Sequence, residues 1–301
     1  MYFQPVYRPT HAIAYLCCIG LSRLPLSVLY AFSFIIFFII YYIFQYRRSV
    51  VHDNLRRCFP ELSEQQRKHI AKKYYQHLAD LVVEILKALT MRHDEVKRRC
   101  RFSHEAATLF EQFSRQKRHC LVLMGHLGNW EWACLSMCMH FPYRLQPVYL
   151  PLRSAFFDGL LLRLRRRFGG EPVSADRAVR VLLAEPEVLT CSVLIADQSP
   201  QPQQATWINF LNRPTPFFAS GFRLAARLRR PIIYAVVRQQ SRGNYLIDAQ
   251  LLSEDSLNET ELLQRFARCL EADVRRSPSQ WLWSHRRWKH SYLFPAVDSA
   301  Q

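Results

Sequence analysis

The sequence predicts an α/β protein, with an N-terminal membrane helix followed by a single domain built on a central mixed or parallel sheet flanked by helices. Two observations support this prediction. Beyond Phe102, short apolar runs of strand character alternate with segments of helical periodicity, which is typical of a buried sheet covered by helices. Before them, Leu24 to Tyr46 carries no charged residue and is long enough to cross a hydrocarbon core of ~30 Å. We expect a membrane anchor over 1–48 and the domain over 49–301.

The first helix after the anchor is expected over 65–89. Ser63 can cap it, because Gln66 at the third helical position would complete a capping box. Leucine, isoleucine and valine then recur at helical spacing from Leu78 to Leu89, which indicates one buried or membrane-facing stripe.

The alternating part of the chain begins with the apolar run 120–124. Strands are expected at 120–124, 146–150, 189–196, 232–237 and 245–251, and helices at 132–140, 156–167, 177–184, 217–228 and 259–276. The stretch 197–216 is rich in proline and glutamine and is expected to be an irregular loop that borders a site.

The net charge of +17 indicates an acidic partner. Arginines cluster beside a hydrophobic anchor, so anionic lipid or a phosphorylated lipid fits better than nucleic acid, for which no recognition motif is present. Arg47 and Arg48 follow the apolar run directly, which favours a cytoplasmic side for everything after it. A buried helix, or one lying in the membrane plane, remains the alternative to a crossing helix.

Nine cysteines occur without a C-x-x-C pair. This pattern indicates reduced thiols and neither a disulfide framework nor a structural metal site. No cofactor motif is present, and none is expected.

The candidate chemistry lies in Gly125-His-Leu-Gly-Asn-Trp-Glu131, between an expected strand and an expected helix. On an ideal helix His126 and Glu131 would point roughly 140° apart, so His126 is placed on the turn and Glu131 in the first helical turn. There Glu131 can accept a proton from one imidazole nitrogen, and the other nitrogen can act as a general base. The alternative is a core histidine beside a capping glutamate, but the two glycines, Asn129 and Trp130 are costly choices for a merely structural turn.

Further candidates lie elsewhere along the chain. Asp197-Gln198 ends an apolar run, where α/β sheets place functional groups, although a turn-forming aspartate is equally compatible. Arg153 has the geometry to hold a phosphate. The 156–167 helix alternates leucines with arginines up to Arg167 and suits an anionic lipid surface. The segment 281–289 interleaves tryptophans with cations, as a packing cluster or a headgroup contact would.

These features together resemble the late acyltransferases of lipid A biosynthesis, the lauroyl and myristoyl transferases of Gram-negative bacteria. The resemblance spans nearly the whole chain and is closest to the Bacteroidetes branch. It is carried by the anchor with its arginines, Asn54-Leu55 with Phe59-Pro60, residues 125–131, Val148-Tyr149-x-Pro151-Leu152, Arg167-Phe168-Gly169, Asp197-Gln198, and Trp283-x-His285-Arg286-Arg287-Trp288-Lys289.

The resemblance implies an inner-membrane O-acyltransferase of lipopolysaccharide biosynthesis, with an acyl carrier protein thioester as donor and a phosphorylated lipid A precursor as acceptor. His126 and Glu131 would be the catalytic pair. Substrate contacts would come from Gly128, Asn129, Trp130, Arg153, Arg167, Asp197 and Gln198. Leu150 departs from the family pattern, which usually has a basic residue there, so Arg153 would have to replace its contact. The alternatives are acylation of a lysophospholipid or another lipid, and a non-catalytic protein that binds anionic lipid.

Overall fold

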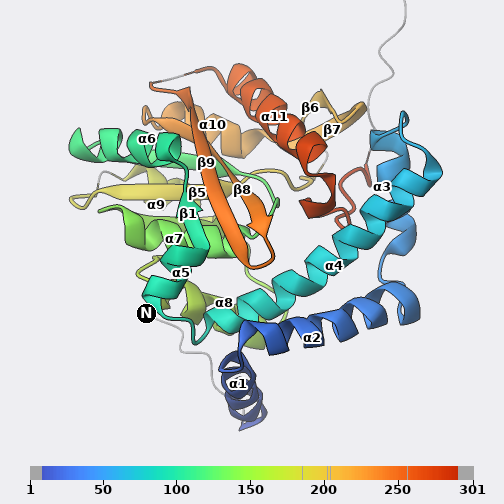
Figure 1. Cartoon of the computed structure of the whole chain (residues 1–301). Coiled ribbons are helices and arrows are strands. Elements are labelled where there is room, and N and C mark those ends of the chain that lie inside the picture. Colours follow the sequence, from blue (N-terminus) through green and yellow to red (C-terminus); the bar gives the residue numbers. More distant parts are fainter. Residues whose placement is uncertain (1–8, 185, 202, 204, 256, 291–301) are drawn as a thin grey trace, which may run out of the picture.

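The computed structural model describes residues 9–290 except 185, 202, 204 and 256. Its central sheet has the strand order β1-β9-β8-β2-β5-β3-β4 (Figure 1). All neighbours pair in parallel except β8 and β9, which form an antiparallel hairpin, so the predicted mixed sheet is confirmed. The strands are β1 Cys100–Phe102, β2 Cys120–Met124, β3 Arg144–Tyr149, β4 Val173–Ser174, β5 Thr190–Ile195, β8 Ile232–Ser241 and β9 Asn244–Ser253.

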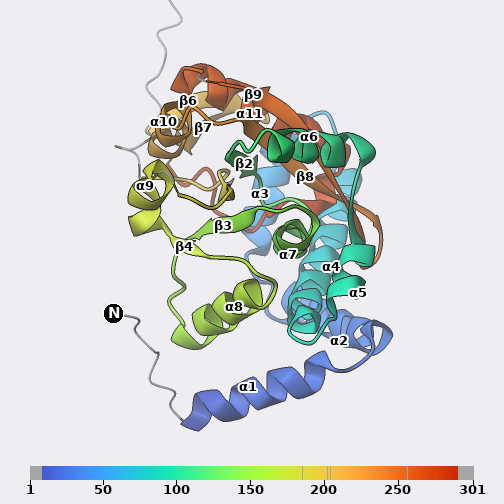
Figure 2. The ribbon, with the colours of Figure 1, turned by 90° about the vertical axis from the view of Figure 1, so that its left-hand side faces the viewer.

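Helices cover both faces of this sheet (Figures 1 and 2). They are α1 Pro9–Ser22, α2 Leu26–Phe38, α3 Arg48–Cys58, α4 Glu64–Ala88, α5 His93–Arg99, α6 His104–Arg115, α7 Trp130–His140, α8 Ala155–Arg167, α9 Ala175–Leu183, α10 Ala219–Arg227 and α11 Glu259–Arg276. A π-helical turn, Ile39–Ile43, continues α2, and a short 3-10 helix, Pro278–Gln280, follows α11. The flanking helices predicted from periodicity are confirmed within a few residues at each end.

Alternation along β2 divides the core in two. Leu121 and Leu123 point into a cluster with α10, α11 and the tryptophans of the C-terminal segment, whereas Val122 and Met124 point into a cluster with α6, α7 and α8. Every residue of β2 is buried, because successive side chains of a strand point to opposite faces and both faces are covered.

The capping box at the start of α4 is confirmed. The Ser63 side chain accepts from the Gln66 amide, and the Gln66 side chain accepts from the Ser63 amide. These two bonds satisfy amides that the first helical turn leaves without a partner.

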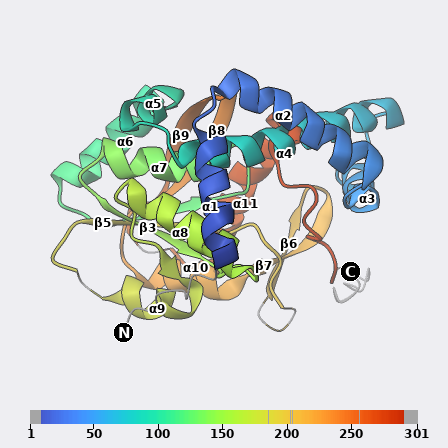
Figure 3. The ribbon, with the colours of Figure 1, turned by 90° about the horizontal axis from the view of Figure 1, so that it is seen from below.

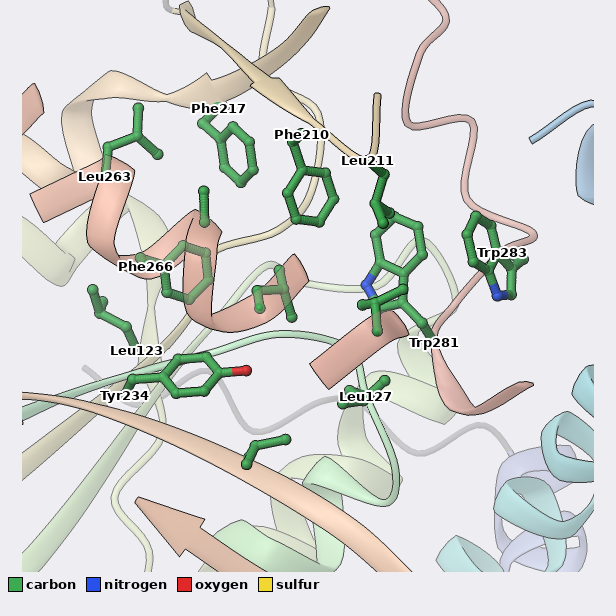
Figure 4. Packing of buried hydrophobic residues seen from close by; sticks show 14 of the residues in the cluster. Leu123, Leu127, Phe210, Leu211, Phe217, Tyr234, Leu263, Phe266, Trp281 and Trp283 are labelled. Carbon is green, nitrogen blue, oxygen red and sulfur yellow. The ribbon is translucent and has the colours of Figure 1, made fainter. Parts of the chain in front are cut away.

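The prediction of an irregular loop over 197–216 was wrong in its second half. Residues Ala205–Phe210 (β6) and Arg213–Phe218 (β7) form an antiparallel hairpin. Prolines hid it from the sequence pattern, but in a two-stranded ribbon a proline is tolerated where no ladder bond is required. Phe210 and Leu211 of this hairpin lie beside Trp281, as Figure 4 shows.

Helix α8 is only partly the lipid-facing helix that was expected. Leu160 and Leu164 are buried in the protein, Arg165 turns inward, and Arg167 donates to the Ala88 carbonyl at the end of α4. Arg163 and Arg166 remain exposed.

Leu26–Ile43 is, among the described residues, a helix long and apolar enough to cross a membrane. It runs along α4 at the lower edge of the molecule, and Figure 3 views it from that side together with α1 and α8.

Candidate active site

His126 lies where β2 ends, on a turn of residues 125–129 that we call the histidine turn. Its Nδ1 is 2.5 Å from Asp197 Oδ1, and its backbone amide donates to Asp197 Oδ2 at 2.8 Å. Asp197 follows β5, the strand next to β2, so the parallel pairing brings the carboxyl ends of both strands to the same edge of the sheet. The position of His126 on the turn, with Glu131 in the first turn of α7, is confirmed.

Asp197 is the carboxylate that engages the imidazole. Burial alone would raise its pKa, but the attraction of His126, together with hydrogen bonds from His126 and Trp281, lowers the pKa of Asp197 to about 2. Trp281 Nε1 donates to Oδ2 at 2.8 Å. An ionised carboxylate can only accept, so the proton of the His126–Asp197 bond resides on Nδ1.

The second imidazole nitrogen is therefore available as an acceptor. Gln198 Nε2 lies 3.2 Å from His126 Nε2 and donates to it. The His126 side chain is 14% exposed, against 2% for Asp197, so the imidazole is the member of the pair that solvent and substrate reach. A hydroxyl in the position of the Gln198 amide would meet a lone pair oriented to take its proton.

Two glycines allow the histidine turn to approach its neighbours. A Cβ on Gly125 would lie 3.2 Å from Asp197 Oδ2 and 2.5 Å from a methyl carbon of Leu270. Gly128 has a φ of +65°, and a Cβ there would lie 2.2 Å from the Val237 carbonyl oxygen. The Gly128 position thus excludes any side chain, because a backbone carbonyl blocks it, whereas a side chain at Gly125 would require Leu270 to shift.

The histidine turn is also bound to the residues that follow α11. The Gly128 amide donates to the Gln280 carbonyl at 3.1 Å, and the Leu282 amide donates to the His126 carbonyl at 3.1 Å. Leu127 packs below the Trp281 ring in Figure 4. The segment 281–289 is accordingly part of the site, and its tryptophans form a packing cluster with Trp281 and Trp283 buried.

Glu131 does not contact His126 as the sequence led us to expect. Its two carboxylate oxygens accept from Arg165, at 3.1 Å from Nε and 2.5 Å from Nη2. The partner expected for the imidazole is instead supplied from β5, since Glu131 in the first turn of α7 faces α8. Burial alone would lower the pKa of Arg165, but the negative charge of Glu131 and its hydrogen bond with Arg165 raise it.

Asn129 fixes the start of α7 and is itself fixed from α4. Its Oδ1 accepts from the Trp132 amide at 2.9 Å, and its Nδ2 donates to Glu84 Oε2 at 2.7 Å. Glu84 is fully buried and also accepts from Tyr30 and Tyr245. Burial is the main reason that the pKa of Glu84 rises to about 7.

The remaining candidates separate into two groups. Trp130 lies against the imidazole, with ring centroids 4.9 Å apart at 75°, so it stays with the site. Arg153 is exposed in the β3–α8 connection, and Arg167 bonds the end of α4, so the geometry does not bring either to His126.

Sequence reasoning missed Arg165, Trp281 and Glu84 as parts of this arrangement. Arg165 was placed among lipid-facing arginines, since periodicity alone does not identify an inward-facing cation. His285 also lies close to the histidine turn, because its amide donates to the Leu282 carbonyl and the Leu282 amide donates to the His126 carbonyl. Burial lowers the pKa of His285 to about 4, which keeps it neutral at pH 7. Among the described residues, no group of three or more histidine, cysteine or acidic side chains is arranged to hold a metal ion.

The family model for bacterial lipid A biosynthesis acyltransferases matches residues 3–290 of this chain. The chain belongs to this family. A lipid A biosynthesis acyltransferase from Haemophilus influenzae is 20% identical to it over 243 residues, covering 79% of this chain and 74% of that relative. A lipid A acyltransferase transfers acyl groups, so the protein is an enzyme, and the histidine turn with Asp197 is its candidate active site.

Proposed function

We propose that this lipid A acyltransferase moves a fatty acyl group from an acyl carrier protein thioester to a hydroxyl of a phosphorylated lipid A precursor. The reaction would be a late step of lipopolysaccharide biosynthesis at the cytoplasmic face of the inner membrane. The observation that carries the chemistry is the hydrogen bond between His126 Nδ1 and Asp197, which directs the opposite nitrogen toward the surface of the site.

In the proposed step, His126 Nε2 takes the proton of the acceptor hydroxyl as its oxygen attacks the thioester carbonyl. The carbon–sulfur bond then breaks, and the imidazolium returns its proton to the leaving thiolate, which restores neutral His126. Base assistance of this kind is typically worth about 10²- to 10⁴-fold in rate. Asp197, ionised and fully buried, stabilises the imidazolium that forms in between.

The oxyanion of the tetrahedral intermediate needs hydrogen-bond donors. The Gly128 amide already donates to Gln280 and the Trp132 amide to Asn129, so we assign this role to the amides of Trp130 and Glu131 at the start of α7. The positive end of the helix dipole also favours negative charge there. Glu131 stays in the site with Arg165, as the ion pair that fixes the first turn of α7 beside the base.

The rest of the chain fits this function in two respects. We assign residues 1–48 to membrane anchoring and residues 49–301 to the catalytic domain. The exposed arginines, Arg153 among them, supply positive charge toward the phosphorylated acceptor, anionic lipids and the acidic carrier protein. Direct transfer, without an acyl-enzyme, is preferred because the histidine turn holds neither serine nor cysteine.

The test is transfer by the purified full chain, offered carrier-bound or coenzyme A-bound acyl groups with a lipid A precursor or lysophosphatidic acid. We expect carrier-dependent acylation of the lipid A precursor, abolished in His126→Ala while the fold and membrane binding persist. Acylation of lysophosphatidic acid alone would replace the proposed acceptor. Transfer by His126→Ala at the rate of the original chain would refute the base.

A further inference from the structure

The apolar helix α2, taken together with the π-helical turn Ile39–Ile43 that continues it, has two different faces. One stripe, at helical spacing, is buried against α4 and its neighbours: Leu26, Leu29, Ser33, Phe37 and Tyr41. The other face is apolar and open: Val28, Phe32, Phe34, Ile35, Phe38, Tyr42 and Ile43 are each at least 41% exposed. A helix that crossed a bilayer alone would need no such division.

Polar groups bind the buried stripe at the middle of the helix. The Ser33 hydroxyl donates to Asp80 of α4, and Arg242, from the turn between β8 and β9, donates to Asp80 at 2.6 Å and to Ser33 at 2.9 Å. The Arg242 guanidinium also lies 4.1 Å from the centre of the Tyr30 ring. A short distance along, Tyr30 donates to Glu84. The buried face of α2 is thus held to the protein by hydrogen bonds, a cation–π contact and the Arg242–Asp80 ion pair beneath it, and we call these contacts the α2 seat.

A crossing orientation would carry the α2 seat into the hydrocarbon. Ser33 is near the centre of Leu26–Ile43, which is about 27 Å long, so Asp80 and Arg242 would lie near the middle of the bilayer. The exposed Lys72 and Lys73 of α4 would also be carried into the hydrocarbon. Charged side chains at that depth are strongly disfavoured, whereas a helix in the membrane plane keeps them on the water side.

Helices α1 and α8 continue the open apolar face. Seen from below in Figure 3, α1 and α2 lie in front with α8 beside α1, and contacts between His11 and Phe156 and between Arg163 and Tyr15 join α1 to α8. This lower surface, defined here as the open faces of α1, α2 and the β3–α8 region, adds the following side chains to those of α2: Ile13, Leu16, Leu21, Leu150, Leu152 and Phe157, each at least 45% exposed.

We infer that the lower surface binds one leaflet of an anionic bilayer, with α1 and α2 in the plane of the membrane, so that the chain does not cross it. Exposed Arg163 of α8, whose guanidinium lies over the Tyr15 ring of α1, is at the edge of this surface, where anionic headgroups would meet it. Both ends of α2 then stay on the side of the catalytic domain. This arrangement does not rest on the proposed acyl donor or acceptor.

The first test is topology, measured with the full chain in sealed membrane vesicles of known orientation. One reporter is a protease-cleavable peptide joined ahead of residue 1. The other is Arg115→Cys on the exposed surface of α6, read with a membrane-impermeant maleimide in a chain that also carries Cys17→Ser, because Cys17 of α1 is itself an exposed thiol. We expect both reporters to react from the same side. Cleavage of the peptide from the side opposite to Cys labelling would overturn the inference.

The second test measures binding to phosphatidylethanolamine–phosphatidylglycerol vesicles. Ile35, 53% exposed on α2, would contact lipid in the bound state. Ile35→Glu should weaken partitioning of the protein to these vesicles about tenfold or more, because it replaces that apolar contact with a negative charge facing anionic lipid. The matched control is Val179→Glu, 55% exposed on α9 and away from the lower surface, which should bind as the original chain does. Equal binding by both variants, with unchanged circular dichroism, would contradict the inference. Correct topology without acyl transfer would refute the proposed function alone.

Discussion

Replacing Asp197 by Asn tests the base assignment at the point where the structure differs from the sequence expectation. The substitution keeps the shape of the side chain and removes its charge. An asparagine amide can donate to His126 Nδ1, which would leave the proton on Nε2, the nitrogen that must accept it. It also leaves no charge to stabilise the imidazolium.

The size of the effect follows from the setting of the carboxylate. The pKa of Asp197 is lowered to about 2 despite complete burial, which corresponds to about 2 kcal/mol of preference for the ionised form in this site. The substitution removes the charge that stabilises the imidazolium in the transition state, and the wrong tautomer adds to the loss. We therefore expect kcat to fall about 10²- to 10⁴-fold with KM little changed.

The assay is single-turnover transfer of a labelled acyl group, followed from pH 5 to 9, with Glu131→Gln as the matched variant. Asp197→Asn should lower the rate about 10²- to 10⁴-fold across this range, because the imidazolium loses its counter-charge. Glu131→Gln should lower it much less, since the Glu131 carboxylate bonds Arg165 and not His126. A large loss in Glu131→Gln together with an unchanged rate in Asp197→Asn would refute the reasoning.

Three other substitutions give separate readouts. Gly128→Ala places a methyl against a backbone carbonyl of β8 at positive φ and should lower the free energy of unfolding by about 3 kcal/mol. Its control, Gly221→Ala in α10, meets nothing within 4 Å and should raise the free energy of unfolding by about 0.5 kcal/mol. Thermal melts distinguish the two variants. Trp281→Phe removes one donor to Asp197 and should raise its pKa and lower kcat about tenfold, as steady-state kinetics will test. Glu84, whose pKa in the fold is about 7 against an ordinary value of 4.5, binds its proton more tightly folded than unfolded, so stability falls as pH rises through this window, by about 3 kcal/mol. Glu84→Gln should remove this component in denaturant titrations from pH 5 to 8, and an unchanged pH dependence would contradict it.

Much of the layer architecture was readable from the chain, because strand and helix periods are local signals. The run 120–124 predicted β2 at its observed bounds, and Glu259–Arg276 is a helix as expected. The β6–β7 hairpin was missed, since its prolines suppress the local strand signal and its pairing is set by packing against Trp281 and α11.

The site was predicted in its parts and missed in its pairing. His126 and Asp197 were both named from their positions after apolar runs. Their contact, however, depends on β2 and β5 being neighbours in the sheet, and strand order is not encoded in spacing along the chain. The carboxylate nearer in sequence, Glu131, was chosen instead, because it lies in the same motif as His126 and the family resemblance implied the same pair.

The apolar N-terminal segment shows the same limit. Length and hydropathy identify Leu26–Ile43 as able to cross a membrane, but they do not reveal that one face of this helix packs on α4. Ser33 and Tyr30 are the polar residues within the run whose partners, Asp80 and Glu84, appear only once the helices are packed.

Proton NMR of the His126 ring tests the central claim most directly. A hydrogen bond of 2.5 Å from Nδ1 to an ionised carboxylate should give a far-downfield N–H resonance in the full chain. The structure predicts that this resonance is lost in His126→Ala and in Asp197→Asn and persists in Glu131→Gln. A resonance that persists in Asp197→Asn and disappears in Glu131→Gln would contradict the His126–Asp197 pair.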